Sequence, residues 1–439
     1  MLSANYLSQE GIVKGEEYDK YSARIKVDYK PIDRVTVGLN LAPNYSTMGR
    51  NSHATDGGDW ASLFAQASLM APIVPIYRED GTYSMNSDLV GALPIGNPLE
   101  TMRNYDYDSD LFRMLGGIYG KWEIIDGLTL MSTASTNIGT DKSETYYVPT
   151  IGQAVPQGMS SVSSYNVGQS QSISWLNENT LNYKKVVQAH SFDILGGFTL
   201  QKNSSESVSA SVRELQVPGV RNVNIGNSDT RSGSNGSFES TLVSYLGRLN
   251  YGFKDRYLVT GTVRTDGSSV FGANNRYQTF GSFALGWRFS EESFMQNISS
   301  LNSGKLRFSY GTTGSNSIPP YASRATLTAR NHSFGGSTLF GTTLGNPGNN
   351  YLTWETSKQM NIGLDVSMFN YCVNLVVDYY NNETTSLLLT KNIVPSSGYS
   401  TFLTNIGSML NKGVELSLDL RVVDTEDWGW SVGGNITFN

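Results

Sequence analysis

The sequence of 439 residues contains little cysteine, little histidine and no long apolar run. Cys372 is the single cysteine, so a disulfide framework is excluded. The histidines, His53, His190 and His332, lie far apart and lack metal-ligand spacing, so neither a metal site nor another cofactor is expected. No apolar run reaches the length of about 18 residues that a membrane-spanning helix needs, which excludes such a helix.

Positive charge is scarce as well. The 32 Lys and Arg residues are outnumbered by 38 Asp and Glu residues, and the net charge is −6. No basic stripe is present to neutralise phosphates, so nucleic acid is not expected as a partner. The mean hydropathy of −0.29 fits a soluble protein and equally a transmembrane β-barrel, in which only every second residue faces lipid.

Two motifs of enzyme type lack the context that they need. RTDGSSVFG (264–272) has the glycine spacing of a phosphate-binding loop, but Ala273 and Asn274 follow it in place of Lys and Ser or Thr. GWSVG (429–433) has the pattern of a nucleophile elbow, but only six residues follow and the last histidine is His332. No catalytic residue is therefore predicted.

Alternating apolar and polar residues recur along the whole chain, which is typical of β-strands with two different faces. About 14 to 16 such strands are predicted, each near the ~9–11 residues that cross a bilayer at a tilt. The alternating segments are 21–29, 35–42, 109–122, 127–138, 170–183, 188–201, 240–253, 256–265, 279–289, 304–311, 357–369, 371–380, 407–422 and 428–438.

The connections alternate between short and long. Short turns such as IDG (125–127) and KDR (254–256) contrast with long polar connections at about 43–108, 139–168, 202–238, 312–356 and 381–406. Short turns on one side and long loops on the other are typical of an antiparallel transmembrane β-barrel in the bacterial outer membrane, with the long loops outside the cell. Aromatic residues near the predicted strand ends are expected to form its interfacial girdles: Tyr251, Tyr257, Tyr379, Trp428 and Trp430.

Several longer stretches stand out, in this order along the chain: YLSQEGIVKG (6–15), MAPIVPIYREDG (70–81), RTDGSSVFGANNRY (264–277), SFALGWRFSEE (282–292), NP (346–347), WET (354–356) and NIGSMLNKGVEL (405–416). Together they resemble the barrel of the SusC/RagA-type family of TonB-dependent outer-membrane transporters. The residues that carry this resemblance are Arg264, Asp266, Gly267, Phe271, Gly272, Trp287, Asn346, Pro347, Trp354, Glu355, Asn405, Gly407, Asn411, Gly413 and Glu415.

The resemblance implies TonB-energised import of glycans or peptides across a lipid bilayer, with a SusD-like surface lipoprotein as partner of the transporter. It also implies a lumen closed by a plug domain. No plug, signal peptide or set of final strands is found in the sequence, so residues 1–439 are expected to be an incomplete barrel that does not transport by itself.

Candidate substrate contacts lie in the predicted long loops, because aromatic rings stack on sugar faces and amides bind hydroxyl groups. They are Trp60, Tyr165, Asn331, His332 and Phe334. Arg264 and Asp266 are expected to pair at the barrel wall.

Two other functions remain open at this point. N-x-[ST] sequences, among them Asn44 and Asn435, are compatible with a secreted all-β adhesion or glycan-binding protein. A siderophore or haem receptor of the wider TonB-dependent group is the other alternative, although histidine is scarce.

Overall fold

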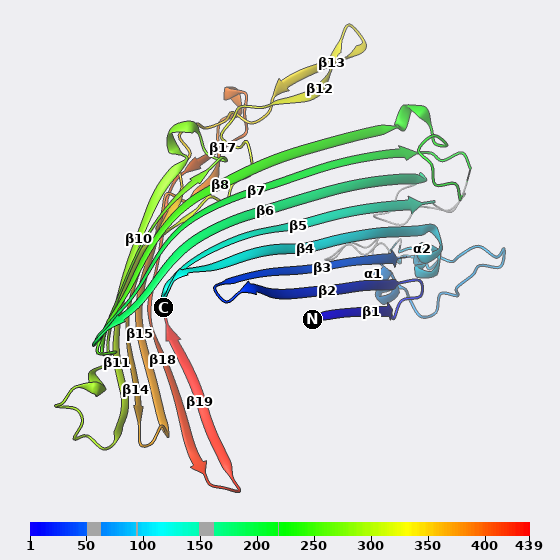
Figure 1. The fold of residues 1–439 in the computed structure, drawn as a ribbon. Helices are drawn as coiled ribbons and strands as arrows, with labels where there is room; N and C mark the ends of the chain where they lie inside the picture. The colour runs from blue at the N-terminus through cyan, green and yellow to red at the C-terminus, as the bar shows by residue number, and fades with distance from the viewer. Residues whose placement is uncertain (51–62, 94, 149–161, 218) are drawn as a thin grey trace.

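The computed structural model describes residues 1–50, 63–93, 95–148, 162–217 and 219–439. They form one antiparallel sheet of 15 strands, which twists and curves into an open trough (Figure 1). The strands of this sheet are β1 (Leu2–Glu10), β2 (Glu17–Ile32), β3 (Val35–Arg50), β4 (Tyr105–Ile125), β5 (Leu128–Tyr147), β6 (Ser164–Val187), β7 (His190–Arg213), β8 (Ser232–Phe253), β9 (Tyr257–Ser268), β10 (Tyr277–Trp287), β11 (Leu301–Ser315), β14 (Glu355–Met368), β15 (Val373–Thr385), β18 (Ser408–Asp424) and β19 (Gly429–Phe438).

Each strand pairs with the next strand of the sheet along the chain, so the topology is a simple meander. In the described residues β1 pairs only with β2 and β19 only with β18, which leaves two free edges. The all-β prediction and the predicted number of strands are thus confirmed. None of the helices in the described part of the chain has both the length and the apolar character to cross a membrane.

The predicted strands are all present, but most are longer than expected. β6 and β7 contain 24 residues each, where ~9–11 residues suffice to cross a bilayer. The additional residues lie toward the long connections, as in NSSESVSASV (203–212) of β7. One face of this stretch is polar throughout, whereas the other carries Ser204 and Glu206 before Val208, Ala210 and Val212, so the alternation is weaker there although the hydrogen-bonded ladder continues.

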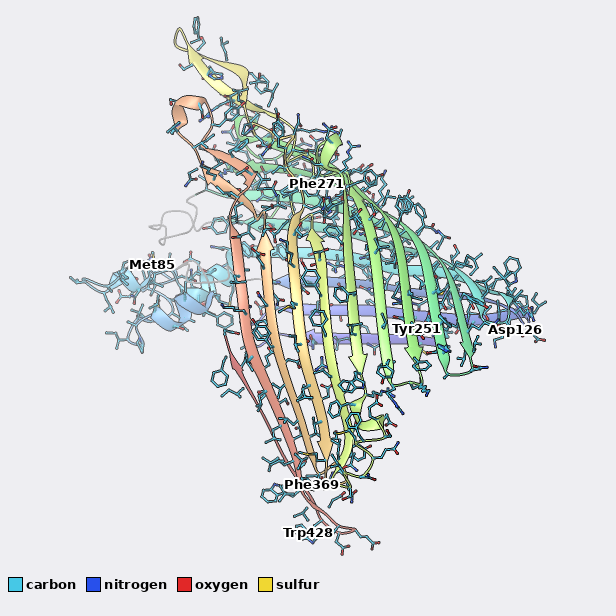
Figure 2. All side chains as sticks on the ribbon, turned by 90° about the vertical axis from the view of Figure 1, so that its left-hand side faces the viewer. Met85, Asp126, Tyr251, Phe271, Phe369 and Trp428 are labelled. Atoms are coloured by element: carbon cyan, nitrogen blue, oxygen red, sulfur yellow. The ribbon has the colours of Figure 1, made fainter. Side chains whose placement is uncertain are left out.

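Short turns and long connections occupy opposite ends of the strands. Figure 2 shows Asp126, Phe369 and Trp428 at the short-turn ends, and Met85 and Phe271 among the long connections. The long connections also contain elements that the sequence did not predict. These are helices α1 (Leu63–Leu69) and α2 (Pro98–Asn104) and two hairpins, β12 (Leu327–Phe334) with β13 (Ser337–Leu344) and β16 (Leu388–Asn392) with β17 (Thr401–Asn405).

The register brings apolar side chains of all the strands onto one face, the apolar face. Leu416 of β18, for example, lies opposite Val377 of β15 and Ile436 of β19. Many of these side chains are exposed, such as Ile118 at 51% and Ile436 at 49%. A row of exposed aliphatic side chains with polar residues on the reverse face is the pattern of a wall between lipid and an aqueous lumen. We call the reverse face the polar face.

Candidate functional site

The long connections pack together around a small buried cluster at one end of the sheet. This loop core consists of Val270, Phe271, Phe280, Ile318, Leu352 and Trp354. The ring of Trp354 lies 5.2 Å from that of Phe271 and 5.8 Å from that of Phe280, centroid to centroid. Its Nε1 donates a hydrogen bond to the Arg276 carbonyl oxygen at 3.0 Å. The loop core therefore joins the β9–β10 turn to the segment that precedes β14.

Asparagine side chains connect neighbouring loops to the loop core. Asn405 Nδ2 donates to the carbonyl oxygens of Thr353 (2.8 Å) and Ser386 (2.9 Å), while its Oδ1 accepts from Thr353 N at 2.9 Å. Asn349 Nδ2 donates to the Leu403 carbonyl oxygen at 3.0 Å. Thr353 and Ser386 lie outside the strands, and Leu403 belongs to the β16–β17 hairpin, so these amides fix the paths of two long connections relative to each other.

Asn346 and Glu355 act in the same way nearby. Asn346 Nδ2 donates to the Ala322 carbonyl oxygen at 2.9 Å, and Pro347 follows it. Glu355 Oε2 accepts from Leu388 N at 3.2 Å, where the β16–β17 hairpin begins. Both side chains therefore position loop backbone.

Two glycines of the family motifs are required by geometry. A Cβ atom on Gly272 would lie 2.6 Å from the Asn350 carbonyl oxygen, so a larger residue would push apart two connections that touch here. Gly407 has φ +83°, a left-handed conformation that favours glycine, and it ends the β15–β18 connection just before β18.

The predicted pair of Arg264 and Asp266 is present on β9. Arg264 Nε lies 2.7 Å from Asp266 Oδ1, and Arg264 Nη2 donates to Ser244 Oγ at 2.9 Å. Asp266 is only 8% exposed, whereas the Arg264 side chain is 41% exposed, so the carboxylate is shielded from water and the guanidinium is not. Gly267 follows beside the ring of Tyr277.

The remaining motif residues lie elsewhere on the sheet. Trp287 is at the short-turn end of β10, where its Nε1 donates to Glu292 Oε1 at 3.1 Å. Asn411, Gly413 and Glu415 alternate along the polar face of β18. The motif residues therefore form a loop-positioning assembly together with scattered wall positions, and they do not converge on one chemical centre.

The polar face carries an ion-pair network at mid-strand. Arg307 of β11 binds Asp365 of β14 through Nε and Nη2, both at 2.8 Å, and Nη2 also reaches Asp378 of β15 at 3.1 Å. Gly363 leaves the space that these side chains fill, because a Cβ there would lie 2.5 Å from Asp378 Oδ1. This face presents charges and amides, which suits a wet lumen.

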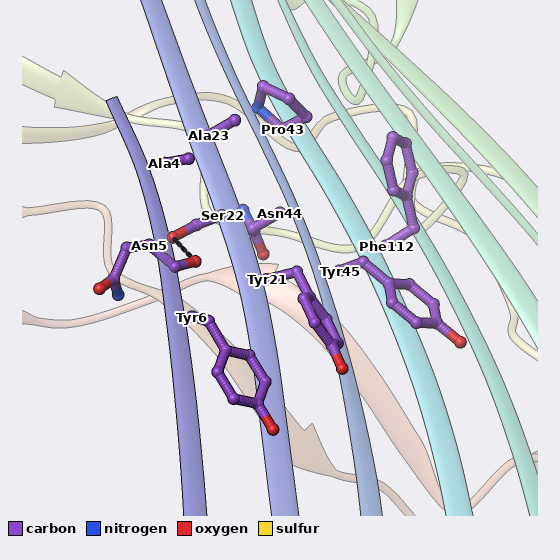
Figure 3. A pocket seen from close by; sticks show the side chains of 10 residues that line it. All are labelled: Ala4, Asn5, Tyr6, Tyr21, Ser22, Ala23, Pro43, Asn44, Tyr45 and Phe112. Atoms are coloured by element: carbon purple, nitrogen blue, oxygen red, sulfur yellow. Dashed lines mark hydrogen bonds between the residues drawn. The ribbon is translucent and has the colours of Figure 1, made fainter. Parts of the chain in front are cut away.

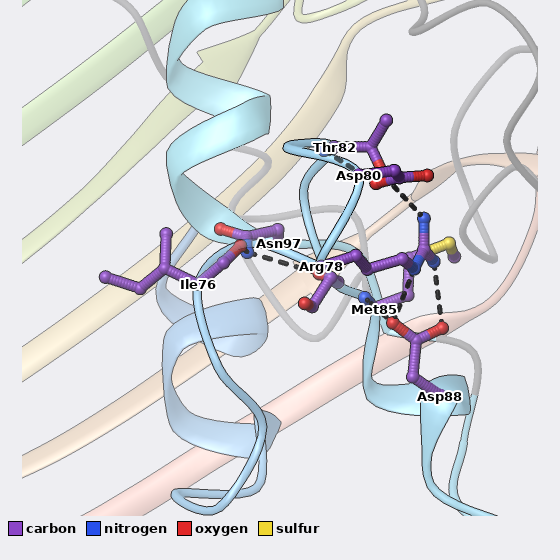
Figure 4. A network of polar contacts seen from close by, with 8 residues as sticks. Ile76, Arg78, Asp80, Thr82, Met85, Asp88 and Asn97 are labelled. Atoms are coloured by element: carbon purple, nitrogen blue, oxygen red, sulfur yellow. Dashed lines mark hydrogen bonds and ion pairs between the residues drawn. The ribbon is translucent and has the colours of Figure 1, made fainter.

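The β3–β4 connection folds into a compact insert, of which residues 63–93 and 95–104 are described. Arg78 holds Asp88 with two hydrogen bonds of 2.8 Å, and Asn97 Nδ2 donates to the Ile76 and Ser84 carbonyl oxygens (Figure 4). The hydrogen bonds from Arg78 lower the pKa of Asp88 below its ordinary value. The sequence motif MAPIVPIYREDG (70–81) thus contributes Arg78 to the fold of a surface loop.

The candidate substrate contacts are dispersed. Asn331, His332 and Phe334 lie on β12, in a hairpin that projects away from the sheet (Figure 1), and Phe334 is 77% exposed. Tyr165 on β6 is buried, and its hydroxyl donates to Glu144 Oε2 at 3.0 Å, which is a packing contact. Trp60 lies outside the described residues. Among the described candidates, the three hairpin residues are the accessible ones.

A shallow groove of about 590 Å³ lies on the apolar face near the long-connection end (Figure 3). Ala4, Ala23 and Pro43 line one side, and the rings of Tyr6 and Tyr21, 4.9 Å apart, lie on the next rung. The hydroxyl of Tyr6 donates to Asp19 Oδ1 at 2.7 Å, one rung further out. This row is a boundary between apolar and charged positions, as expected of an aromatic girdle.

No set of three or more His, Cys, Asp or Glu side chains arranged to hold a metal ion occurs among the described residues. The geometry therefore offers a wall, an assembly of loops and an exposed hairpin.

Comparison with known proteins gives a consistent result. Residues 38–439 match the family described as TonB dependent receptor-like, beta-barrel. The chain is 35% identical over 434 residues to TonB-dependent receptor P26 of Formosa agariphila, covering 98% of this chain and 42% of that protein. It is 38% identical over 205 residues to TonB-dependent receptor SusC of Bacteroides thetaiotaomicron, covering 46% of this chain and 20% of that protein.

Solved structures share the fold. The RagAB peptide transporter superposes with a TM-score of 0.84 at 24% identity, covering all of this chain and 48% of that chain. The siderophore receptor PiuA from Acinetobacter baumannii gives a TM-score of 0.53 at 14% identity. The chain spans about two fifths of the length of the curated receptors P26 and P3 of Formosa agariphila. The chain therefore belongs to the TonB-dependent receptor family, and it carries β-barrel structure of that family.

Proposed function

We propose that the protein containing this chain imports glycans or peptides across the bacterial outer membrane, driven by the TonB complex and assisted by a SusD-like surface lipoprotein. The observation that carries the proposal is the division of the sheet into a continuous apolar face and a polar face with charges such as Arg307 and Asp378. Such a wall separates lipid from an aqueous path. Relatives named SusC and RagAB support import as the purpose of that path.

In this scheme the sheet of the described residues is one part of the wall. The loop core holds the long connections in place at the outer surface, and the β12–β13 hairpin offers Asn331, His332 and Phe334 to solvent. Amide and aromatic groups suit carbohydrate as well as peptide ligands, so the chemistry of these loops leaves both substrate classes in the proposal.

Growth of a strain that lacks the gene tests the proposal. Loss of growth on one class of polymer, either a glycan or a peptide mixture as the carbon source, is expected, with normal growth on monosaccharides and free amino acids. Unchanged growth on both polymers, together with a defect limited to iron-poor medium, would favour a siderophore receptor. A defect in surface attachment alone would favour an adhesion protein.

Co-purification tests the second part of the proposal, the association with a SusD-like surface lipoprotein. A tagged full-length gene product, solubilised in mild detergent, is expected to co-purify with a surface lipoprotein. Co-purification is compared with that of a variant that lacks the β12–β13 hairpin (residues 327–344), because this hairpin projects outside the 15-stranded sheet.

A further inference from the structure

A cluster of four rings lies on the apolar face beside the short turns. It consists of His190, Phe192, Tyr251 and Phe253, from β7 and β8. The ring centroids of His190 and Phe253 are 4.8 Å apart, and those of Phe192 and Tyr251 are 5.2 Å apart. His190 Nδ1 lies 2.8 Å from the Tyr251 hydroxyl oxygen. The rings thus form one continuous aromatic surface, which we call the ring cluster.

Two lysines flank the ring cluster. Lys254 Nζ lies 5.4 Å from the centroid of Phe253, and Lys185 of β6 is directly opposite Phe192 in the register. Both residues are exposed, and neither forms an ion pair within the described part of the chain. The neighbouring Lys184, which belongs to the polar face, pairs with Asp193 Oδ2 at 3.6 Å. Two unpaired cations therefore face the same side as the apolar belt.

Apolar side chains continue from the ring cluster toward the centre of the sheet. Ile194 follows Phe192 on β7 and pairs with Leu249 of β8, and these side chains are 47% and 42% exposed. At the opposite edge of the belt β2 and β4 carry the acidic residues Asp19 and Asp110, and Lys202 of β7 is paired with Glu239 of β8. Unpaired lysines next to exposed aliphatic residues match a ligand with an anionic head and an apolar tail.

We propose that the ring cluster, with Lys185 and Lys254, binds the phosphate head group of an anionic glycerophospholipid. The two ammonium groups contact the phosphate, because long lysine side chains extend from an apolar surface to the charged interface. The acyl chains lie along Ile194 and Leu249. The inference rests on the proposed membrane location of the sheet and is independent of the imported substrate.

Lipid retention by the full-length gene product tests the site. The protein is reconstituted into nanodiscs of phosphatidylglycerol and phosphatidylcholine in equal amounts, and the lipids retained after release are counted by native mass spectrometry. We expect phosphatidylglycerol to be retained at least about fivefold over phosphatidylcholine, given two interfacial lysines. Lys185→Gln with Lys254→Gln is expected to abolish this preference, and Lys185→Arg with Lys254→Arg to keep it.

The control removes two charges at the other end of the molecule, Lys14→Gln with Lys391→Gln, and is expected to retain the preference. Circular dichroism verifies that each variant is folded. Equal retention of both lipids by the unmodified protein, or an unchanged preference in the Lys185 and Lys254 glutamine variant, overturns the inference. Import is not part of this measurement, so failed lipid selectivity and failed import are separate results.

Discussion

The middle of the sheet and the loop core at its end are built on different physical principles. The sheet is a single layer whose aliphatic side chains, such as Leu416 (37% exposed) and Ile436 (49%), have no protein layer over them. The loop core buries Phe271 to 1% and Trp354 to 4% exposure within a few connecting segments. The sheet therefore depends on its hydrogen-bonded ladder and, in the proposed membrane location, on the surrounding lipid, whereas the loops depend on packing and on specific hydrogen bonds.

This difference determines which substitutions destabilise the wall and which destabilise the loop core. In the wall the side chain must suit its face, while its exact shape has little effect because nothing packs closely over it. In the loop core both shape and hydrogen bonding are specified, as in an ordinary protein interior.

The largest effect is expected in the loop core. Trp354→Ala removes a buried ring and its hydrogen bond to Arg276, which costs about 3–5 kcal/mol of local stability. Limited proteolysis of intact cells that carry the full-length protein is expected to cleave the connections around residues 316–354 and 386–407. Trp428→Ala is the matched control, because Trp428 is 76% exposed. In this variant, cleavage around residues 316–354 and 386–407 should stay at the level of the unmodified protein.

The second effect concerns the apolar face. Leu416→Arg places a charge at mid-belt on the lipid side, at a cost of about 2–4 kcal/mol. Glu415→Gln, one residue away on the polar face, is expected to change stability little. Urea unfolding in lipid vesicles measures both variants, and equal losses for both would contradict the assignment of the faces.

A smaller effect is expected from the asparagine contacts. Asn405→Ala removes hydrogen bonds to Thr353 and Ser386 and leaves their backbone groups without this partner, at about 1–3 kcal/mol. Hydrogen exchange near residues 353 and 386 should become faster. Asn392→Ala, at an exposed position of β16, should leave exchange unchanged.

The smallest effect is a pH dependence of the β3–β4 insert. The pKa of Asp88 is lowered in the folded protein, so its pair with Arg78 stabilises the insert fully above the ordinary value of 3.8. This contribution is lost as the pH falls through the folded pKa, and it is below about 1 kcal/mol because the pair is partly exposed. Proteolysis of the insert should increase on acidification, and Asp88→Asn should weaken that dependence.

The sequence predicted the wall better than the loops, for a physical reason. A strand with lipid on one side and water on the other must alternate, so segments such as 413–422 are visible without any contact information. The extensions of β6 and β7 were missed because polar residues such as Gln169 and Glu206 interrupt the row of apolar positions. The β12–β13 hairpin was missed although its signal is local, a Gly-Gly pair between Phe334 and Ser337. Strands β16 and β17 with 5 residues each and helices α1 and α2 with 7 residues each are too short to show a clear period in the sequence.

The candidate site was predicted only in part. The pairing of Arg264 with Asp266 followed from residues two apart on one strand face, and it is present in the structure. The role of Asn405 could not be read from the chain, because its partners Thr353 and Ser386 become neighbours only in the folded loops. Substrate contacts at Asn331, His332 and Phe334 stay a prediction.

Cysteine labelling of β18 tests the central claim, that the two faces of the sheet meet lipid and water. In a full-length protein with Cys372→Ser, single cysteines replace residues 414–421 one at a time in outer membranes. A water-soluble maleimide is expected to label positions 415, 417, 419 and 421, and a lipid-soluble maleimide positions 414, 416, 418 and 420. Labelling without this two-residue period, or with the two reagents reversed, would contradict the account.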